Sequence, residues 1–269
     1  MSEKIIFAKM HGLGNDFIII DRQELPKNCN EQELALQIAN RRSGIGCDQL
    51  IIYYKEHNYY NMLVYNQDGS TAKACGNASR CLAKLMYDRF AEERIILKVS
   101  GRELTCKILA ANEISVNMGP VSFNENWMAR PEKIWSILEN YMVDPKEIVF
   151  AEIGNLHLII FSHLSDQDKE LIGAKLQQKE LFPDGINVNF ASIKENKIYL
   201  SVWERGTGFT LACGSGACAS FAAAVKLGFV TSPNEVVFEL GALSMIKNEE
   251  DIIMCGPATL VALGEFYYG

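Results

Sequence analysis

Two cysteine–glycine pairs, Cys75-Gly76 and Cys213-Gly214, are the residues of this 269-residue chain best suited to chemistry. Each pair opens a stretch that predicts a helix. The unpaired N–H groups and partial positive charge of a helix start favour a thiolate over a thiol. Two such starts facing each other would bind one carboxylate and present a sulfur to each face of the neighbouring carbon. That arrangement suits removal of a proton from one face and its return to the other.

The segments around the two cysteines are two copies of one pattern. Asn66 lies nine residues before Cys75, and Glu204 lies nine residues before Cys213. Further matches keep the same order at nearly the same offset, which favours a long internal duplication over chance similarity of glycine loops. The duplication predicts two similar lobes related by a pseudo-twofold axis. The further matches are Gly14-Asn15-Asp16-Phe17-Ile18-Ile19 with Gly154-Asn155-Leu156-His157-Leu158-Ile159, Gly46 and Gln49 with Gly185 and Asn187, Gly101 with Gly241, and Met118-Gly119-Pro120 with Cys255-Gly256-Pro257.

Polar residues near the repeated motifs supply the other candidate site residues. An amide at Asn66 and a carboxylate at Glu204 break the symmetry, as a substrate with unlike ends requires. Glu204 could hold an ammonium group or tune a thiol, and Arg205 could hold a carboxylate in bidentate fashion. The alternative is a surface Glu–Arg pair. His157 is either a satisfied structural residue or an acid–base helper. Neutral candidates for substrate contacts are Asn15, Asn155 and Asn187, with His11 and Gln49 as weaker ones.

Other cysteine and glycine patterns do not support a different chemistry. The eight cysteines are spaced neither like a small disulfide framework nor like a structural zinc site. The Gly-x-Gly pairs do not complete a dinucleotide motif in its strand–helix context, and no P-loop is present. A cysteine hydrolase with a distant histidine would leave the second Cys-Gly pair without a role. We therefore expect no metal and no cofactor.

Composition and charge are typical of a globular protein with a small-molecule substrate. Hydrophobic residues make up 48% of the chain, enough for two cores of ordinary domain size. A net charge of −7 argues against binding to nucleic acid. No apolar run approaches the roughly 20 residues of a membrane helix, and a secretory signal is not recognisable. We expect a cytoplasmic protein without nucleic-acid or membrane partners, and the sequence leaves a homodimer open.

Hydrophobic periodicity predicts an α/β (α+β) fold of many short strands and few helices. Asn30 and Glu33 form a predicted capping box for a helix that extends to about Arg42. A helical insertion is expected near residues 126–142. Strands are predicted at residues 4–9, 16–21, 50–54, 61–65, 95–99, 105–110 and 114–117.

Two predicted helices follow the Cys-Gly pairs. The second, with Ala217 to Val225, has almost no polar face, so a curled sheet should surround it. The predicted division places residues 1–118 in an N-terminal lobe, to which the strand 261–269 returns, and residues 119–260 in a C-terminal lobe.

At these motifs the chain resembles the diaminopimelate epimerase family. The resemblance implies two lobes, each a barrel-like, mostly antiparallel sheet around a central helix, with the site between them. It also implies a pyridoxal-independent, two-base epimerase that interconverts LL- and meso-2,6-diaminopimelate in lysine and peptidoglycan precursor synthesis. The matching blocks extend over almost the whole chain and are residues 9–17, 44–49, 66–70, 75–81, 154–157, 204–208 and 212–218.

The resemblance further implies a role for each matching residue. Cys75 and Cys213 would be the base and the acid, exchanging roles with the direction of reaction. His157 and Glu204 would assist the thiols and the reacting amine. The backbone amides of Gly76, Asn77, Gly214 and Ser215 would bind the reacting carboxylate, and the remaining substrate groups would be held by Asn15, Gln49, Asn66, Asn155, Asn187 and Arg205.

Three positions depart from the family's usual pattern. Ala78 replaces a glycine and should be tolerated within a helix. Leu156 replaces a proline and would leave His157 less fixed. Phe209 replaces a glutamate and leaves the substrate open. Two alternatives therefore remain, a racemase of the same two-cysteine design acting on another amino acid, and a non-catalytic protein that keeps the duplicated scaffold to bind a ligand.

Overall fold

The computed structural model of the chain describes residues 3–72, 76–123 and 131–269. The chain divides into two compact units. Unit 1 comprises Met1–Asn117 and Cys255–Gly269, and unit 2 comprises Met118–Met254. Within the described ranges, no helix is both long enough and apolar enough to cross a membrane.

Unit 1 is built on a mixed sheet with the strand order β16-β1-β2-β3-β4-β5-β6-β7. The pairs β2–β3 and β4–β5 are parallel, and the other neighbours are antiparallel. Leu13 and Gly14 both have positive φ and form the two-residue hairpin turn between β1 and β2. The strands are β1 (Glu3–Gly12), β2 (Asn15–Asp21), β3 (Gln49–Glu56), β4 (Tyr59–Asn66), β5 (Arg94–Val99), β6 (Arg102–Ala110), β7 (Glu113–Pro120) and β16 (Thr259–Tyr268).

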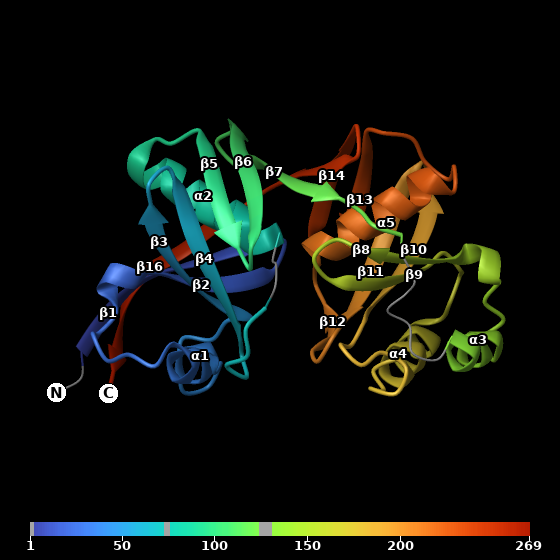
Figure 1. The fold of residues 1–269 in the computed structure, drawn as a ribbon, viewed down its shortest axis with the longest axis horizontal. Coiled ribbons are helices and arrows are strands. Elements are labelled where there is room, and N and C mark those ends of the chain that lie inside the picture. The colour runs from blue at the N-terminus through green and yellow to red at the C-terminus, as the bar shows by residue number, and fades with distance from the viewer. Residues whose placement is uncertain (1–2, 73–75, 124–130) are drawn as a thin grey trace. The chain divides into compact units, whose positions relative to one another are not determined.

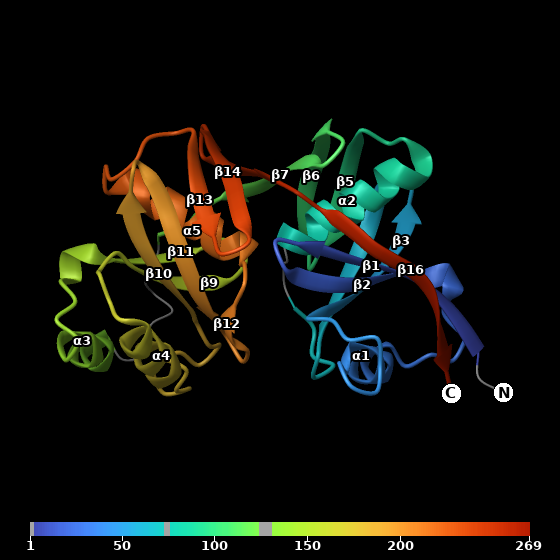
Figure 2. The same ribbon diagram turned by 180° about the vertical axis from the view of Figure 1, so that it is seen from behind.

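Two helices pack on opposite faces of this sheet. The helix α2 (Gly76–Phe90) lies inside the curl of the strands, and it contacts β1, β2, β5, β6 and β16 (Figures 1 and 2). The helix α1 (Glu31–Ala39) covers the outer face, where Leu34 and Ile38 pack against apolar side chains of β2 and β3. Both faces of the central strands are therefore buried, which explains their continuous apolar runs. A 3₁₀ turn, η1 (Arg22–Glu24), follows β2.

The start of α1 is as the sequence predicts, and its end is not. The Asn30 side chain caps the helix by accepting hydrogen bonds from two backbone N–H groups of the first turn. The helix ends at Ala39 instead of about Arg42. Asn40 explains the difference, because its side-chain oxygen accepts hydrogen bonds from two backbone N–H groups just after it and turns the chain away.

Unit 2 repeats this connectivity, with the strand order β15-β14-β13-β11-β10-β9-β8 and β12 paired to β11. The pairs β9–β10 and β11–β13 are parallel, as β2–β3 and β4–β5 are in unit 1. The strands are β8 (Ile148–Glu152), β9 (Leu156–Ile160), β10 (Asn187–Lys194), β11 (Lys197–Glu204), β12 (Gly208–Thr210), β13 (Asn234–Phe238), β14 (Gly241–Asn248) and β15 (Asp251–Gly256).

The helices of unit 2 also follow the pattern of unit 1. The helix α5 (Gly214–Lys226) is buried from its start to Ala224 and contacts six strands, so the sheet surrounds it as its apolar composition predicts. On the outer face lie α3 (Pro131–Glu139) and α4 (Asp166–Lys175). The predicted insertion at 126–142 contains α3, and its residues 126–130 lie outside the described residues. A 3₁₀ turn, η2 (Pro145–Glu147), precedes β8.

Strand register equates positions of the two units. On the parallel pair β2–β3, Phe17 lies opposite Gln49, and on β9–β10, His157 lies opposite Asn187. Two residues further along β10 stands Asn189, which like His157 points to the face covered by α5. The predicted fold class, an α/β protein of two similar sheet-dominated lobes, is confirmed.

Candidate active site

The predicted site residues form one group in each unit. Cys75 lies outside the described residues, and the other predicted residues are all described. Unit 1 carries Asn15, Gln49, Asn66, Gly76 and Asn77, and unit 2 carries Asn155, His157, Asn187, Glu204, Arg205, Cys213, Gly214 and Ser215.

Cys213 is the N-cap residue of α5. Its backbone is extended (φ −126°, ψ 111°), and its side chain makes no capping hydrogen bond. The following residues, Gly214 and Ser215, form the first helical positions and are buried. The N–H groups of a first helical turn have no acceptor within the helix, so this start can bind an anion. The structure thus brings together in unit 2 a thiol and a helix start that is able to bind an anion.

The thiol of Cys213 continues into a buried chain of hydrogen bonds. Its Sγ lies 3.6 Å from Ser215 Oγ, and Ser215 Oγ lies 3.1 Å from His157 Nε2. The other ring nitrogen, His157 Nδ1, lies 3.1 Å from Asn189 Oδ1. Asn155 adds a donor, because its Nδ2 lies 3.5 Å from the Ser215 oxygen. Three of the predicted residues therefore join Cys213 in one cluster.

The tautomer of His157 follows from its neighbours. Asn189 Nδ2 donates to the carbonyl oxygen of Gly216 at 2.9 Å and to Ser220 Oγ at 2.9 Å. A carbonyl oxygen only accepts, so the other amide atom of Asn189 is its oxygen, and Nδ1 of His157 must carry the proton. Burial lowers the pKa of the fully buried His157 from 6.5 to about 4, despite the hydrogen bond to Asn189. The ring is therefore neutral near pH 7, and its Nε2 is an acceptor.

The remaining predicted residues of unit 2 lie at the ends of β10 and β11. Asn187 links two backbone segments, since its amide donates to Leu156 O at 3.1 Å and accepts from Arg205 N at 3.0 Å. The Arg205 side chain donates to Asp184 O at 2.5 Å and passes over Gly185, where an added Cβ would lie 2.2 Å from Arg205 Cδ. These contacts hold the backbone of Arg205 in place beside β10.

Glu204 ends β11 and accepts a hydrogen bond from Thr210 Oγ1 at 2.5 Å. Phe209, where the family pattern has a glutamate, packs edge-on against Trp203 with ring centroids 5.2 Å apart. The aromatic residue therefore extends an apolar surface beside the β11–β12 turn instead of adding a charge.

In unit 1, amides at the start of α2 are connected to charged groups. Asn77 Nδ2 donates to Asn15 Oδ1 at 3.1 Å, and Arg80 Nη2 donates to Asn77 Oδ1 at 3.0 Å. Arg80 is fully buried, and its Nε donates to Pro257 O at 3.1 Å. A buried guanidinium keeps its charge and can only donate. Asn77 must therefore accept from Arg80 through its oxygen and donate to Asn15 through its nitrogen.

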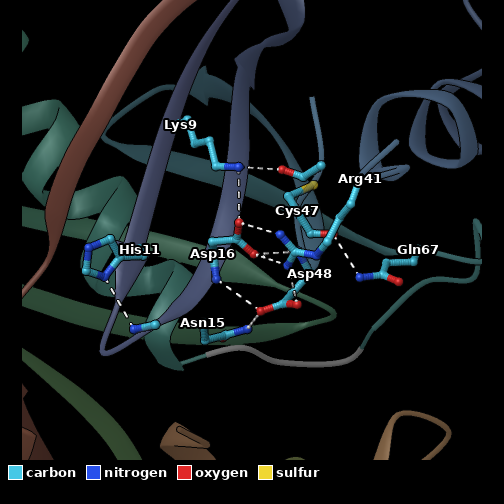
Figure 3. Close-up of polar contacts among 10 residues, drawn as sticks. Lys9, His11, Asn15, Asp16, Arg41, Cys47, Asp48 and Gln67 are labelled. Atoms are coloured by element: carbon cyan, nitrogen blue, oxygen red, sulfur yellow. Dashed lines mark hydrogen bonds and ion pairs between the residues drawn. The ribbon is translucent and has the colours of Figure 1, made fainter. Parts of the chain in front are cut away.

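The other end of this series is the charged cluster shown in Figure 3. Asn15 Nδ2 donates to Asp48 Oδ2 at 2.9 Å, and Arg41 Nη2 contacts Asp48 Oδ1 at 2.9 Å and Asp16 Oδ1 at 2.6 Å. Lys9 pairs with Asp16 at 3.2 Å. Burial alone would raise the pKa of Asp16, but hydrogen bonds from Arg41 and Lys9 outweigh it and hold that pKa below its usual value.

Gln49 and Asn66 form a cross-strand pair in unit 1, with Gln49 Nε2 donating to Asn66 Oδ1 at 2.9 Å. Asn66 Nδ2 donates to Ser70 Oγ at 3.0 Å. His11 has a local structural contact, because its Nδ1 accepts from Gly14 N at the hairpin turn at 3.3 Å.

Sequence reasoning did not assign roles to Asn189, Arg80, Arg41 or Asp48. Asn189 carried one usable signal, a polar residue at the alternate position of an apolar strand. Asp48 and Arg80 carried only their place in the matching blocks 44–49 and 75–81, and Arg41 carried no signal, since its carboxylate partners become neighbours only through the fold.

Solved structures share the fold of this chain, with its two similar lobes. A hydroxyproline epimerase from Agrobacterium vitis, solved with trans-4-hydroxy-L-proline, matches with a TM-score of 0.69 at 10% identity over 98% of this chain and 91% of that one. A phenazine biosynthesis protein of the PhzF family from Bacillus anthracis matches with a TM-score of 0.72 at 14% identity, over 98% and 99%. At these identities the likeness shows the fold alone.

The sequence comparisons specify the family. The family model for diaminopimelate epimerase matches residues 7–124 and 149–261. The diaminopimelate epimerase of Rickettsia prowazekii is 59% identical over 100% of this chain and 99% of its own length, and that of Rickettsia typhi is 58% identical over 99% of each. The chain belongs to the diaminopimelate epimerase family, and the resemblance inferred from its motifs is confirmed. It is an isomerase of the epimerase type.

Proposed function

We propose that this protein interconverts LL- and meso-2,6-diaminopimelate by moving a proton between two cysteines and one α-carbon, without a cofactor. The observation that carries the proposal is Cys213 at the start of the buried helix α5, with its thiol hydrogen-bonded and anion-binding N–H groups beside it. The relatives at 59% and 58% identity bear the name of this activity. The product would serve lysine and peptidoglycan precursor synthesis.

The proposed reaction balances in one proton and one electron pair. A thiolate at Cys75 takes the α-proton, the C–H pair passes to the α-carbon and its carboxylate, and the Cys213 thiol returns a proton to the opposite face. The carbanion is stabilised where charge develops, by backbone N–H groups of Gly76, Asn77, Gly214 and Ser215. In the reverse direction the two sulfurs exchange roles.

The other predicted residues have supporting roles in this proposal. Glu204 and His157 would act at the reacting amine and near the thiol. Amides and the backbone around Arg205 would hold the distal end of the substrate. The pairs already formed, such as Gln49 with Asn66, support pre-organisation, because a fixed amide loses little freedom when it binds.

The proposal is tested by incubating LL-diaminopimelate with the purified protein in heavy water and following deuterium at the α-carbons. We expect meso product with deuterium at the inverted carbon, and a loss of inversion with Cys213→Ala or Cys75→Ala, in which the remaining thiol can exchange deuterium only at its own face. Inversion without solvent deuterium, or retained activity in either variant, would contradict two-base transfer. Turnover of another amino acid and not of diaminopimelate would identify a sibling racemase instead.

Cofactor independence has its own test. Hydroxylamine removes carbonyl cofactors, so activity that persists after treatment and dialysis supports the proposal, and lost activity restored by pyridoxal phosphate contradicts it.

A further inference from the structure

We propose that the Ser215 hydroxyl is a two-position hydrogen-bond switch that follows the protonation of Cys213, with His157 as its fixed acceptor and Asn189 as the residue that positions His157. This inference rests on the proposed role of Cys213 as an acid or base. It adds two side-chain groups to that role, the hydroxyl of Ser215, of which the sequence assigned only the backbone amide, and the amide of Asn189, which was not assigned.

The first position of the switch follows from the geometry. His157 Nε2 has no proton, so Ser215, 3.1 Å away, must donate its only hydroxyl proton to it. The Ser215 oxygen then offers only lone pairs, one to the amide of Asn155 and one to Cys213 Sγ at 3.6 Å. Cys213 is therefore the donor in its contact with Ser215. This state favours the thiol, because a thiolate would face a lone pair.

The second position needs only rotation of the hydroxyl. When Cys213 has given its proton to the substrate, the Ser215 O–H can turn from His157 to the sulfur and stabilise the new thiolate. His157 Nε2 then loses its donor, and no proton moves to the ring. The fully buried imidazole would be costly to charge, which agrees with its lowered pKa of about 4. His157 therefore acts as an acceptor and not as a proton carrier.

Asn189 holds His157 in the tautomer whose Nε2 accepts a hydrogen bond. Its amide is held by two contacts on α5, with Gly216 O and Ser220 Oγ, and so its oxygen always faces His157 Nδ1. Without Asn189 the ring could take the other tautomer and present a donor to Ser215. Two charged residues at and just after the end of β11 are engaged in other contacts, Glu204 with Thr210 and the Arg205 guanidinium with Asp184 O.

The consequence is that Cys213 favours its thiol form while Ser215 donates to His157. Turning the hydroxyl toward a thiolate costs the bond to His157, and this cost biases Cys213 toward its thiol form. Removal of the acceptor should release the hydroxyl and so increase the thiolate. A residue that only fills space would have no such effect.

The test measures the Cys213 thiolate by ultraviolet absorbance at fixed pH, as the difference between each protein and the same protein carrying Cys213→Ala. His157→Phe introduces the residue that unit 1 has at the equivalent position, Phe17. We expect the thiolate-to-thiol ratio of Cys213 to rise by about tenfold or more, the effect of a hydrogen bond to a charged group. An unchanged or lower ratio would overturn the switch.

Ser215 supplies the control. In Ser215→Ala the same His157→Phe change should leave the ratio unchanged, and in Ser215→Thr, which keeps a hydroxyl, it should raise the ratio again. An equal rise with and without the hydroxyl would show that the effect does not pass through Ser215 and would also overturn the proposal. Asn189→Ile, as a single substitution, should also raise the thiolate-to-thiol ratio of Cys213. If His157→Phe does not fold, the double variant His157→Phe/Asn189→Ile replaces it.

The outcome is separable from that of the proposed function. Retained epimerisation in Cys213→Ala would remove the two-base scheme, whatever the thiolate signal. A lost epimerase activity in Cys213→Ala with an unchanged thiolate ratio in His157→Phe would keep that scheme and remove the switch alone.

Discussion

The two central helices begin in different chemical surroundings, although the strands that present them have the same connectivity. At the start of α2, Asn77 and Asn15 are connected at both ends to charged groups, Arg80 on one side and Asp48 with Arg41 on the other. At the start of α5, the equivalent network ends in a neutral histidine and an amide. The same framework therefore carries two kinds of polar network. In unit 1 charged groups fix the direction of the hydrogen bonds, and in unit 2 the hydroxyl of Ser215 can rotate between two acceptors.

The difference comes from a few substitutions between equivalent positions. Phe17 and Ile51 of unit 1 correspond to His157 and Asn189 of unit 2 by strand register, and both apolar side chains are buried. On the helices, the fifth residue is Arg80 in α2 and Cys218 in α5. A buried charge therefore stands near the start of α2, and a rotatable hydroxyl, that of Ser215, stands at the start of α5.

The largest effect should come from the thiols themselves. Cys213→Ala removes an acid–base group, and general acid–base catalysis contributes about 10²–10⁴-fold to rate. We expect kcat for epimerisation to fall by that factor while the binding of substrate, measured by calorimetry, changes little. Cys218→Ala, a buried cysteine one turn further along α5, is the matched control and should keep activity. Equal losses in both variants would assign the effect to packing of α5.

The second test compares Arg80 with Cys218. Arg80→Met leaves the buried Asn77 Oδ1 and the partly buried Pro257 O without this donor, and each such loss costs about 1–3 kcal/mol when the acceptor is buried. We expect the free energy of unfolding, measured with urea, to fall by about 2–5 kcal/mol. Cys218→Ala should cost about 1 kcal/mol, because only a small apolar group is removed. If both variants lose the same stability, the charged network of unit 1 is not a structural element.

The third test measures how the free energy of unfolding depends on pH, which should reflect the buried His157 of unit 2. Its pKa is lowered from 6.5 to about 4 in the folded protein by burial, so between these values the unfolded chain binds a proton that the folded chain does not. The stability that neutral His157 contributes is present above pH 6.5 and is lost as pH falls toward 4. We expect a loss of roughly 2–4 kcal/mol in the free energy of unfolding across this window.

His157→Phe is the control for this pH dependence. It removes the titrating group, so the slope of stability against pH between 6.5 and 4 should flatten. A slope as steep as in the unsubstituted protein would mean that other groups titrate in this window. Asp16 does not interfere, because its pKa lies below its ordinary value and its contribution is lost only at lower pH.

Some of this arrangement is readable from sequence, and the reason differs from one element to the next. The burial of α5 was predictable because its residues are apolar on every side. The helix α4 was not predicted, since only Ile172 and Gly173 of its ten residues are buried and no apolar stripe marks it.

The site divides in the same way. Cys213 and His157 were found because each stands in a motif that occurs twice. Asn189 and Arg80 were not given roles, because each has a partner that is distant in sequence: Asn189 meets His157 across 32 residues, and Arg80 meets Pro257 across 177 in addition to Asn77 on its own helix. Only the folded register brings such groups together. The direction of a hydrogen bond, which decides the state of Ser215, depends on those distant partners.

The smallest expected effect tests whether equivalent outer helices of the two units contribute equally to stability, as their shared connectivity suggests. The outer helices α1 and α4 occupy equivalent places and begin with side-chain caps of the same kind. Asn30 accepts from two N–H groups of the first turn, and Ser165 Oγ accepts from Asp168 N at 3.1 Å. Asn30→Ala and Ser165→Ala should each lower the free energy of unfolding by about 0.5–2 kcal/mol, with no change in kcat. Similar costs for the two caps, beside unlike results for Arg80 and Cys218, would locate the asymmetry of the units at the starts of the central helices. A large cost for one cap alone would extend the asymmetry to the framework.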